Sequence, residues 1–120
     1  MQQIKNGYIE CMLWADSLED DQGEEIDFNG ISEALSSSIT DDIEKFISLS
    51  NKLIDEALEV DNYYLENIGH DFWLTRNGHG SGFWDGDIPY QLGDKLTAIA
   101  EGFKTFDLWV DNGQLQGEQI

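Results

Sequence analysis

The chain has 120 residues, the length of one ordinary domain, and sets 25 Asp and Glu against six Lys and Arg, for a formal net charge of −19. Direct binding to DNA, RNA or an anionic membrane needs a basic surface, so this charge excludes those ligands. The hydrophobic content of 40% is enough for a core, no stretch approaches the roughly 18 apolar residues of a membrane span, and the single Cys11 excludes an internal disulfide. We predict one folded, cytosolic domain over residues 1–120.

The charge is concentrated in the first half of the chain. Residues 1–66 hold 17 acids and three bases, whereas residues 67–120 hold eight acids and three bases. Self-repulsion on this scale destabilises a compact state, so the acidic surface either serves solubility or is itself the binding device. We divide the domain into an acidic helical half, residues 1–60, and a half made of a hairpin, a helix and strands, residues 61–120.

Two helices are expected in the acidic half. Apolar residues recur at helical spacing over residues 3–17, and the polar stretch 17–30 that follows indicates a loop. The second helix is predicted from Thr40, a favourable N-cap, to Leu58, with one apolar stripe facing the core. The acids of this helix fall largely off the stripe and are expected to face solvent.

A β-hairpin is expected at the start of the second half. Residues 70–75 have a strand-like pattern, the segment up to Gly82 is rich in glycine, and Phe83 and Trp84 begin a returning strand. On strands, adjacent aromatic residues point to opposite faces of the sheet, so one aromatic face packs on the helices. The other face is covered by loops, exposed as an interface, or buried by dimerisation.

The C-terminal segment adds a helix and one or two strands. The spacing of apolar residues predicts a helix over 92–103 and a strand over 105–110. Asp111-Asn112-Gly113 is a hairpin signal that leads into residues 114–116. The expected fold class is α+β: a small antiparallel sheet, made of the β-hairpin plus one or two C-terminal strands, packed against about three helices.

Two motifs are similar to ligand-binding loops but lack required residues. Glycines at 78, 80 and 82 suggest a phosphate loop, but Phe83 stands where the dinucleotide fingerprint needs glycine, and no Gly-Lys-Ser/Thr follows. Residues 25–33 overlay part of a calcium loop, but Ser36 stands in place of the bidentate glutamate. We therefore expect no cofactor and no specific metal site.

The two histidines are the remaining candidates for chemistry. With Asp71, Asp85 and Asp87, His70 and His79 would supply the groups of a His/carboxylate metal site or an acid–base pair. Their spacing matches no metal-binding motif. We predict that the protein is not an enzyme, and a small enzyme or metal-binding protein stays open as an alternative.

The segment from His70 to Asp85 is more distinctive than any generic motif: it reads His-Asp-Phe-Trp-Leu-Thr-Arg-Asn-Gly-His-Gly-Ser-Gly-Phe-Trp-Asp. With residues 93–97 and 106–110, it resembles a family of small acidic proteins of phages, prophages and mobile elements. The resemblance covers residues 60–116, and the N-terminal half is similar only in being acidic and helical. It implies an accessory protein in the cytoplasm of a bacterial host, with no catalytic residues to carry over.

The phage context and the charge together predict an inhibitor of a bacterial defence system. Such an anti-CRISPR or anti-restriction protein imitates nucleic acid and stoichiometrically blocks the DNA- or RNA-binding site of a host defence complex. The expected contacts are acids of the loop and second helix, with two tryptophans as apolar anchors: Glu19, Asp20, Asp21, Glu24, Glu25, Asp27, Asp41, Asp42, Glu44, Asp55, Glu56, Glu59, Trp73 and Trp84. The alternative is a non-catalytic phage adaptor that binds through its aromatic sheet face, and a homodimer is compatible with either.

Overall fold

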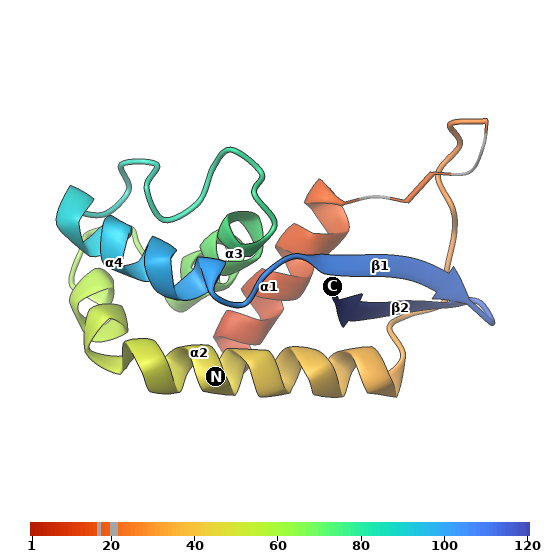
Figure 1. Cartoon of the computed structure of the whole chain (residues 1–120), viewed down its shortest axis with the longest axis horizontal. Coiled ribbons are helices and arrows are strands. Elements are labelled where there is room, and N and C mark those ends of the chain that lie inside the picture. The colour runs from red at the N-terminus through yellow and green to blue at the C-terminus, as the bar shows by residue number, and fades with distance from the viewer. Residues whose placement is uncertain (17, 20–21) are drawn as a thin grey trace.

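The computed structural model describes residues 1–16, 18–19 and 22–120, which form four helices followed by one two-stranded hairpin (Figure 1). The elements are α1 (Gln2–Ala15), α2 (Glu33–Leu58), α3 (Leu65–Arg76), α4 (Tyr90–Glu101), β1 (Phe106–Asp111) and β2 (Gln114–Gln119). The α+β class is confirmed, and α1 and α4 match the helices predicted over residues 3–17 and 92–103. None of the helices in the described ranges is long and apolar enough to span a membrane.

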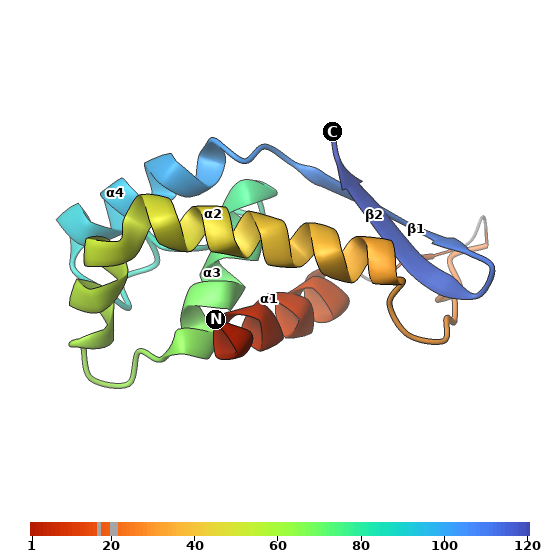
Figure 2. The ribbon, with the colours of Figure 1, turned by 90° about the horizontal axis from the view of Figure 1, so that it is seen from below.

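α1 and α3 meet where their backbones touch. A Cβ added at Gly7 would lie 2.1 Å from the carbonyl oxygen of Glu66, and one added at Gly69 would lie 2.0 Å from that of Ile4. Only glycine permits so close an approach, because any side chain would collide with the opposing backbone. Figure 2 shows the two helices meeting beside α2. This contact fixes the position of α3 in the centre of the molecule.

α2 is the longest helix and begins earlier than the sequence predicts. Its N-cap is Ser32 rather than Thr40, and the Ser32 hydroxyl accepts a hydrogen bond from the Leu35 backbone N–H at 3.0 Å. Leu35 is buried and continues the apolar stripe toward the N-terminus, which favours the earlier start. The helix kinks at Ser50 (φ −124°, ψ 16°), where the Ser50 hydroxyl donates to the Phe46 carbonyl.

The strand predicted over residues 70–75 is wrong, because these residues belong to α3. Phe72 and Trp73 are adjacent and both buried, since α3 is covered on more than one side. Phe72 stacks on Phe46 of α2 with 4.3 Å between ring centroids, and Trp73 meets Tyr8 of α1 edge-on at 5.2 Å. A helix enclosed on several sides lacks the one-faced apolar pattern by which helices are recognised in a sequence.

The returning strand predicted at Phe83 and Trp84 is also wrong, because residues 77–89 connect α3 to α4 as a loop. Phe83 is buried, and its backbone N–H donates to the Thr75 hydroxyl at 3.3 Å, which anchors the loop on α3. Gly82 has a φ of +152°, a conformation that favours glycine. The aromatic sheet face expected in this region is therefore not formed by the described residues.

The C-terminal hairpin lies where the sequence predicts it. Asn112 and Gly113 have φ values of 53° and 76°, the two positive angles that a type I′ turn requires. The outer edge of β2 is bonded to the segment that enters α2. The Leu115 N–H donates to the Gly30 carbonyl at 3.0 Å, and the Ser32 N–H donates to the Leu115 carbonyl at 3.0 Å. These bonds attach the end of the α1–α2 loop to the hairpin.

Candidate functional site

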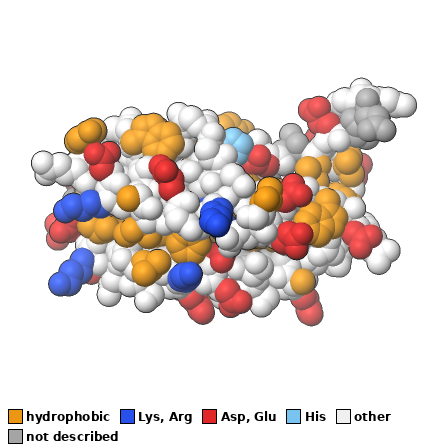
Figure 3. All heavy atoms as spheres, viewed as in Figure 1, with side chains coloured by type: hydrophobic (Ala, Val, Ile, Leu, Met, Phe, Trp, Pro, Cys, Tyr) orange, Lys and Arg blue, Asp and Glu red, His pale blue; other side chains and the backbone are white. Residues whose placement is uncertain are grey.

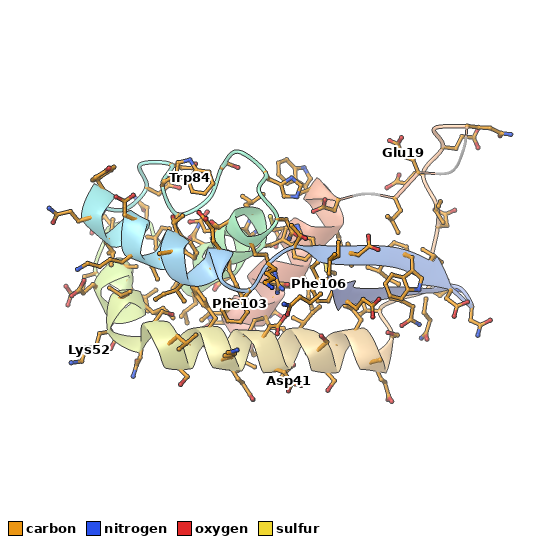
Figure 4. All side chains as sticks on the ribbon, in the orientation of Figure 1. Glu19, Asp41, Lys52, Trp84, Phe103 and Phe106 are labelled. Atoms are coloured by element: carbon orange, nitrogen blue, oxygen red, sulfur yellow. The ribbon has the colours of Figure 1, made fainter. Side chains whose placement is uncertain are left out.

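The loop between α1 and α2 carries the first group of predicted contact acids. Glu19 and Glu25 face each other in an antiparallel bridge, and the Ile26 N–H donates to the Leu18 carbonyl at 2.8 Å. The loop projects from one end of the molecule, with Glu19 exposed on it (Figure 4). Asp20 and Asp21 lie outside the described residues. The exposed acids of the described part are called the acidic loop: Glu19, Glu24, Glu25 and Asp27.

The outer face of the hairpin adds acids that the sequence did not point to as contacts. Asp107, Trp109 and Asp111 alternate along β1 and therefore share one face, and Glu118 of β2 lies directly opposite Asp107. All four are exposed, Trp109 by 39%. With the glutamines paired to β1, these residues are called the hairpin face: Asp107, Trp109, Asp111, Gln114, Gln116 and Glu118.

The acidic loop and the hairpin face form one end of the molecule, which we call the acidic end. Besides the bonds of Leu115, the Asn29 N–H donates to the Gly113 carbonyl and ties the two segments together. The described residues 18–19, 22–31 and 105–119 hold seven exposed acids and no Lys or Arg. Figure 3 shows acidic side chains over this end of the visible face, whereas the Lys and Arg side chains lie over the helices.

The acids predicted on α2 lie on a different surface. Figure 4 places Asp41 on the outer side of α2, away from Glu19 of the acidic loop. The kink at Ser50 further divides the α2 set into an early and a late group. Five of these acids are exposed: Asp41, Glu44, Asp55, Glu56 and Glu59. The predicted contact acids therefore form two separate surfaces rather than one contiguous face.

Asp42, the remaining predicted acid of α2, is engaged inside the molecule. Its carboxylate pairs with the Arg76 guanidinium at 2.8 Å; the Arg76 side chain is 0% exposed and that of Asp42 is 20% exposed. Arg76 also donates to the carbonyls of Phe103 and Lys104 at 3.0 and 2.9 Å, and its guanidinium lies 5.1 Å from the centre of the Phe106 ring. Asp42 therefore helps to hold α2, α3 and the segment after α4 together.

The two tryptophans expected as anchors differ in exposure. Trp73 is 1% exposed, and its indole N–H donates to the Asp16 carboxylate, so the fold gives it no surface for a partner. Trp84 is 42% exposed and borders an open hollow of about 470 Å³ together with Glu101 and Lys104. Trp84 is thus the surface residue of the pair.

The histidines do not meet at one site. His79 Nε2 lies 2.9 Å from the Asp16 carboxylate, and His70 Nε2 lies 3.5 Å from that of Glu10. Within the described part of the chain, no group of three His, Cys, Asp or Glu side chains is placed to hold a metal ion. Burial raises the pKa of the Cys11 thiol to about 12, so this thiol is protonated at neutral pH.

Asp71 is a buried acid of α3 with a structural partner. The Tyr63 hydroxyl donates to its carboxylate at 2.6 Å. Burial raises the pKa of Asp71 from 3.8 to about 6; the Tyr63 hydrogen bond lowers it, and the charges of Asp85 and Asp87 raise it. The pair joins the turn before α3 to the helix itself.

Searches of protein-family models, of curated proteins and of solved structures find no match to this chain. On the molecule itself, the acidic end has the most distinctive chemistry. Its seven exposed acids and the absence of bases in its described segments create a field of one sign. Such a surface attracts Lys and Arg side chains, above all those arranged to hold a polyanion.

Proposed function

We propose that this protein is a non-catalytic inhibitor of a bacterial defence system, an anti-CRISPR or anti-restriction protein that occupies a nucleic-acid-binding site as an acidic mimic. The observation that carries the proposal is the acidic end, with seven exposed acids and no Lys or Arg in its described segments. The resemblance of residues 60–116 to small phage proteins supplies the biological context. The inhibitor acts by occupying the site and catalyses no reaction.

The acidic loop suits a channel lined by Lys and Arg. B-DNA presents one negative charge per roughly 1.7 Å of helix axis, and its protein partners hold it with basic surfaces. Glu19 and Glu25 are neighbours across the bridge, and Asp27 follows on the same exposed segment, so several carboxylates project together. Charge complementarity of this kind speeds association and makes it sensitive to salt.

The loop is favoured over α2 as the contact surface. On α2 the exposed Lys45 and Lys52 interrupt the acids, and Asp42 is held by Arg76. The segment between α1 and α2 contains no Lys or Arg among its described residues. The loop also projects from the body, which lets it enter a recess that the flank of a long helix cannot reach (Figure 1).

Charge reversal of the loop tests the proposal. A variant with all four acids of the acidic loop changed to Lys should lose inhibition and stay folded, because these side chains are exposed. The matched control changes four exposed α2 acids to Lys and shifts the net charge equally: Asp41, Glu44, Asp55 and Glu56. The control should keep most of the inhibition. Full inhibition by the loop variant would contradict the acidic-loop contact.

Capture from bacterial lysates that contain CRISPR and restriction complexes identifies the partner. We expect recovery of a nucleic-acid-binding defence complex that is released by high salt and by competing DNA, because both displace charge-based contacts. Mass spectrometry of the bound proteins gives the readout. A partner that stays bound at high salt and is not displaced by competing DNA would contradict the proposal that the protein imitates nucleic acid.

A second candidate function is that of a phage adaptor. The observation that favours it is the exposure of Trp84 (42%) and Tyr90 (78%), which flank residues 85–89. Large exposed aromatic side chains are typical of protein interfaces. If the adaptor function holds, the double change Trp84→Ala and Tyr90→Ala should abolish partner capture, whereas charge reversal of the acidic loop should leave it intact.

A further inference from the structure

One exposed lysine, Lys45, lines a groove between α2 and α4. Lys45 and Leu49 of α2 line this groove together with Ile99 of α4 and Phe103, around a cavity of about 160 Å³. The Lys45 ammonium lies 5.7 Å from the centre of the Phe103 ring. The groove thus combines apolar side chains with the Lys45 ammonium, and Asp42 and Gln119 also line it.

Three more exposed lysines lie close to these groove residues along the chain. Lys52 follows Leu49 by one helical turn on α2, Lys95 precedes Ile99 by one turn on α4, and Lys104 directly follows Phe103. Figure 3 shows Lys and Arg side chains over α2 and α4 on the visible face. We call these lysines and the two apolar residues between them the lysine groove: Lys45, Leu49, Lys52, Lys95, Ile99 and Lys104. Ile99 is partly buried and the others are exposed, and Lys104 also borders the hollow beside Trp84.

The other basic residues of the described chain are used internally. Lys5 donates to the hydroxyls of Ser36 and Thr40, at 2.8 Å each. Arg76 is buried against Asp42. In a molecule with a net charge of −19, the exposed lysines of the described residues therefore lie on α2, on α4 and on the segment that follows α4.

The hairpin lies toward one end of the long axis and α4 toward the other, and Figure 3 shows acidic side chains over the hairpin and Lys and Arg side chains over the helices on the same face. Its exposed apolar residue is Trp109, with Asp107 and Asp111 on either side of it along β1. Asp107 and Glu118 are directly opposite across the strands, and like charges in that position repel. A cation placed beside them would relieve the repulsion.

We infer that this face binds a second copy of the chain, in an antiparallel arrangement that sets the hairpin face of each copy on the lysine groove of the other. One side of the molecule holds both halves of a complementary pair, so a two-fold axis that lies in the plane of this side, at right angles to the long axis, satisfies both contacts at once. Trp109 then covers Leu49 and Ile99, while Asp107, Asp111 and Glu118 approach the lysines.

The dimensions of the face agree with a dimer. The extents of the molecule are 42 × 26 × 25 Å, and Figure 1 views it down the shortest axis, so this face spans the two longer ones. A standard interface needs roughly 800 Å² from each partner, which such a face can supply. At physiological salt the screening length is about 8 Å, so nearby opposite charges outweigh the distant repulsion between two acidic copies.

The inference goes beyond the proposed function and does not rest on it. The dimer uses the hairpin face, whereas the proposed inhibitor contacts its target through the acidic loop. Figure 4 shows Glu19 above the hairpin in this view, on the loop that projects from the body. A dimer would therefore present two acidic loops, and loop variants and hairpin variants test the two proposals separately.

Paired charge reversals test the dimer by sedimentation equilibrium at physiological salt. The groove variant changes Lys45 and Lys95 to Glu, and the hairpin variant changes Asp107 and Asp111 to Lys. Each variant alone should associate at least about tenfold more weakly than the wild type, because like charges then face each other in both contacts. An equimolar mixture of the two variants should form a heterodimer, because both contacts again join opposite charges.

The control variant carries Asp61→Lys and Glu66→Lys, two exposed acids that belong neither to the lysine groove nor to the hairpin face, and should dimerise like the wild type. Circular dichroism shows that each variant is folded. A wild type that stays monomeric at the highest concentration it reaches would overturn the inference. So would variants that dimerise normally, or a mixture of folded variants that stays monomeric, because a different surface or partner would then be involved.

Discussion

The helical body and the acidic end of this molecule handle charge in different ways. In the body, Arg76 is buried against Asp42 and three aromatic rings, and exposed lysines lie among the surface acids. At the acidic end, exposed acids lie together without a base in the described segments. The body uses opposite charges to hold its helices, whereas the acidic end keeps charges of one sign close together.

This difference means that the charged residues of the body serve mainly stability, whereas those of the acidic end serve mainly binding. A buried pair stabilises a fold only while both partners are present, and removing one partner is costly. Exposed like charges cost little individually, but together they create a field that selects a basic partner. Substitutions in the body should therefore change the free energy of unfolding strongly, whereas those at the acidic end should change it little and affect binding instead.

The largest effect is expected from Arg76→Met. The change leaves the Asp42 carboxylate and the carbonyls of Phe103 and Lys104 without their donor. Breaking a buried ion pair by removing one partner costs about 3–5 kcal/mol of unfolding free energy, which urea denaturation would measure. The control Lys52→Met removes an exposed cation and should cost less than about 0.5 kcal/mol. Equal costs for the two variants would contradict the structural role of Arg76.

A pH-dependent effect is expected from Asp71→Asn. Because burial raises the pKa of Asp71 from 3.8 to about 6, protonated Asp71 contributes stability that is fully present below about pH 4 and is lost as the pH rises through about 6. Asn stays neutral and still accepts the hydrogen bond from Tyr63. From pH 4 to pH 7 the variant should gain about 2–3 kcal/mol relative to the wild type.

Urea denaturation of both proteins at each pH gives this difference. Taking the difference between variant and wild type removes the contribution of the other acids. The exposed Asp94→Asn on α4 serves as the control and should show no comparable trend. A difference between Asp71→Asn and the wild type that does not change with pH would contradict the burial argument.

A smaller loss is expected from Gly69→Ala. The added methyl would lie 2.0 Å from the Ile4 carbonyl oxygen, so α1 and α3 must move apart. Overpacking of this kind costs about 1–3 kcal/mol, measurable as a lower melting temperature. Asn6→Ala, at an exposed position of α1, should change the stability by less than about 0.5 kcal/mol. A Gly69→Ala protein as stable as the wild type would show that the two helices can separate without cost.

The smallest effect, and the one with the opposite sign, is expected at the acidic end. Asp107→Asn removes the repulsion with Glu118 across the hairpin and should stabilise the monomer by about 0.2–1 kcal/mol at low salt. The gain should disappear at high salt, where the charges are screened. Asp94→Asn is again the matched control. A destabilised Asp107→Asn monomer would show that the acid makes a favourable contact within the hairpin.

The sequence was sufficient where a local rule decides the structure. Asn112 and Gly113 fit one turn type, and the buried residues of α1 and α4 recur at helical spacing. The sequence misled at α3, because neighbours cover Phe72 and Trp73 on different sides and remove the helical pattern. It also missed Ser32 as the N-cap of α2, although serine is a preferred capping residue.

The candidate site was predictable only in part. The acids of the loop stand out in composition, and those described are exposed. That Asp107, Asp111 and Glu118 join them depends on the contact of Leu115 with residues 30 and 32, which no local pattern encodes. The pairing of Asp42 with Arg76 likewise joins residues 34 positions apart. Long-range contacts therefore decided which of the predicted acids share a surface.

The hydrogen bonds of Leu115 to Gly30 and Ser32 have a mechanical consequence. They bond the segment that enters α2 to the middle of β2. The C-terminal end of the α1–α2 loop is therefore attached to both α2 and the hairpin. A force that a bound partner applies to the loop is therefore transmitted to both α2 and the hairpin. The loop base thus keeps its shape under load, and little conformational freedom remains to be lost when a partner binds.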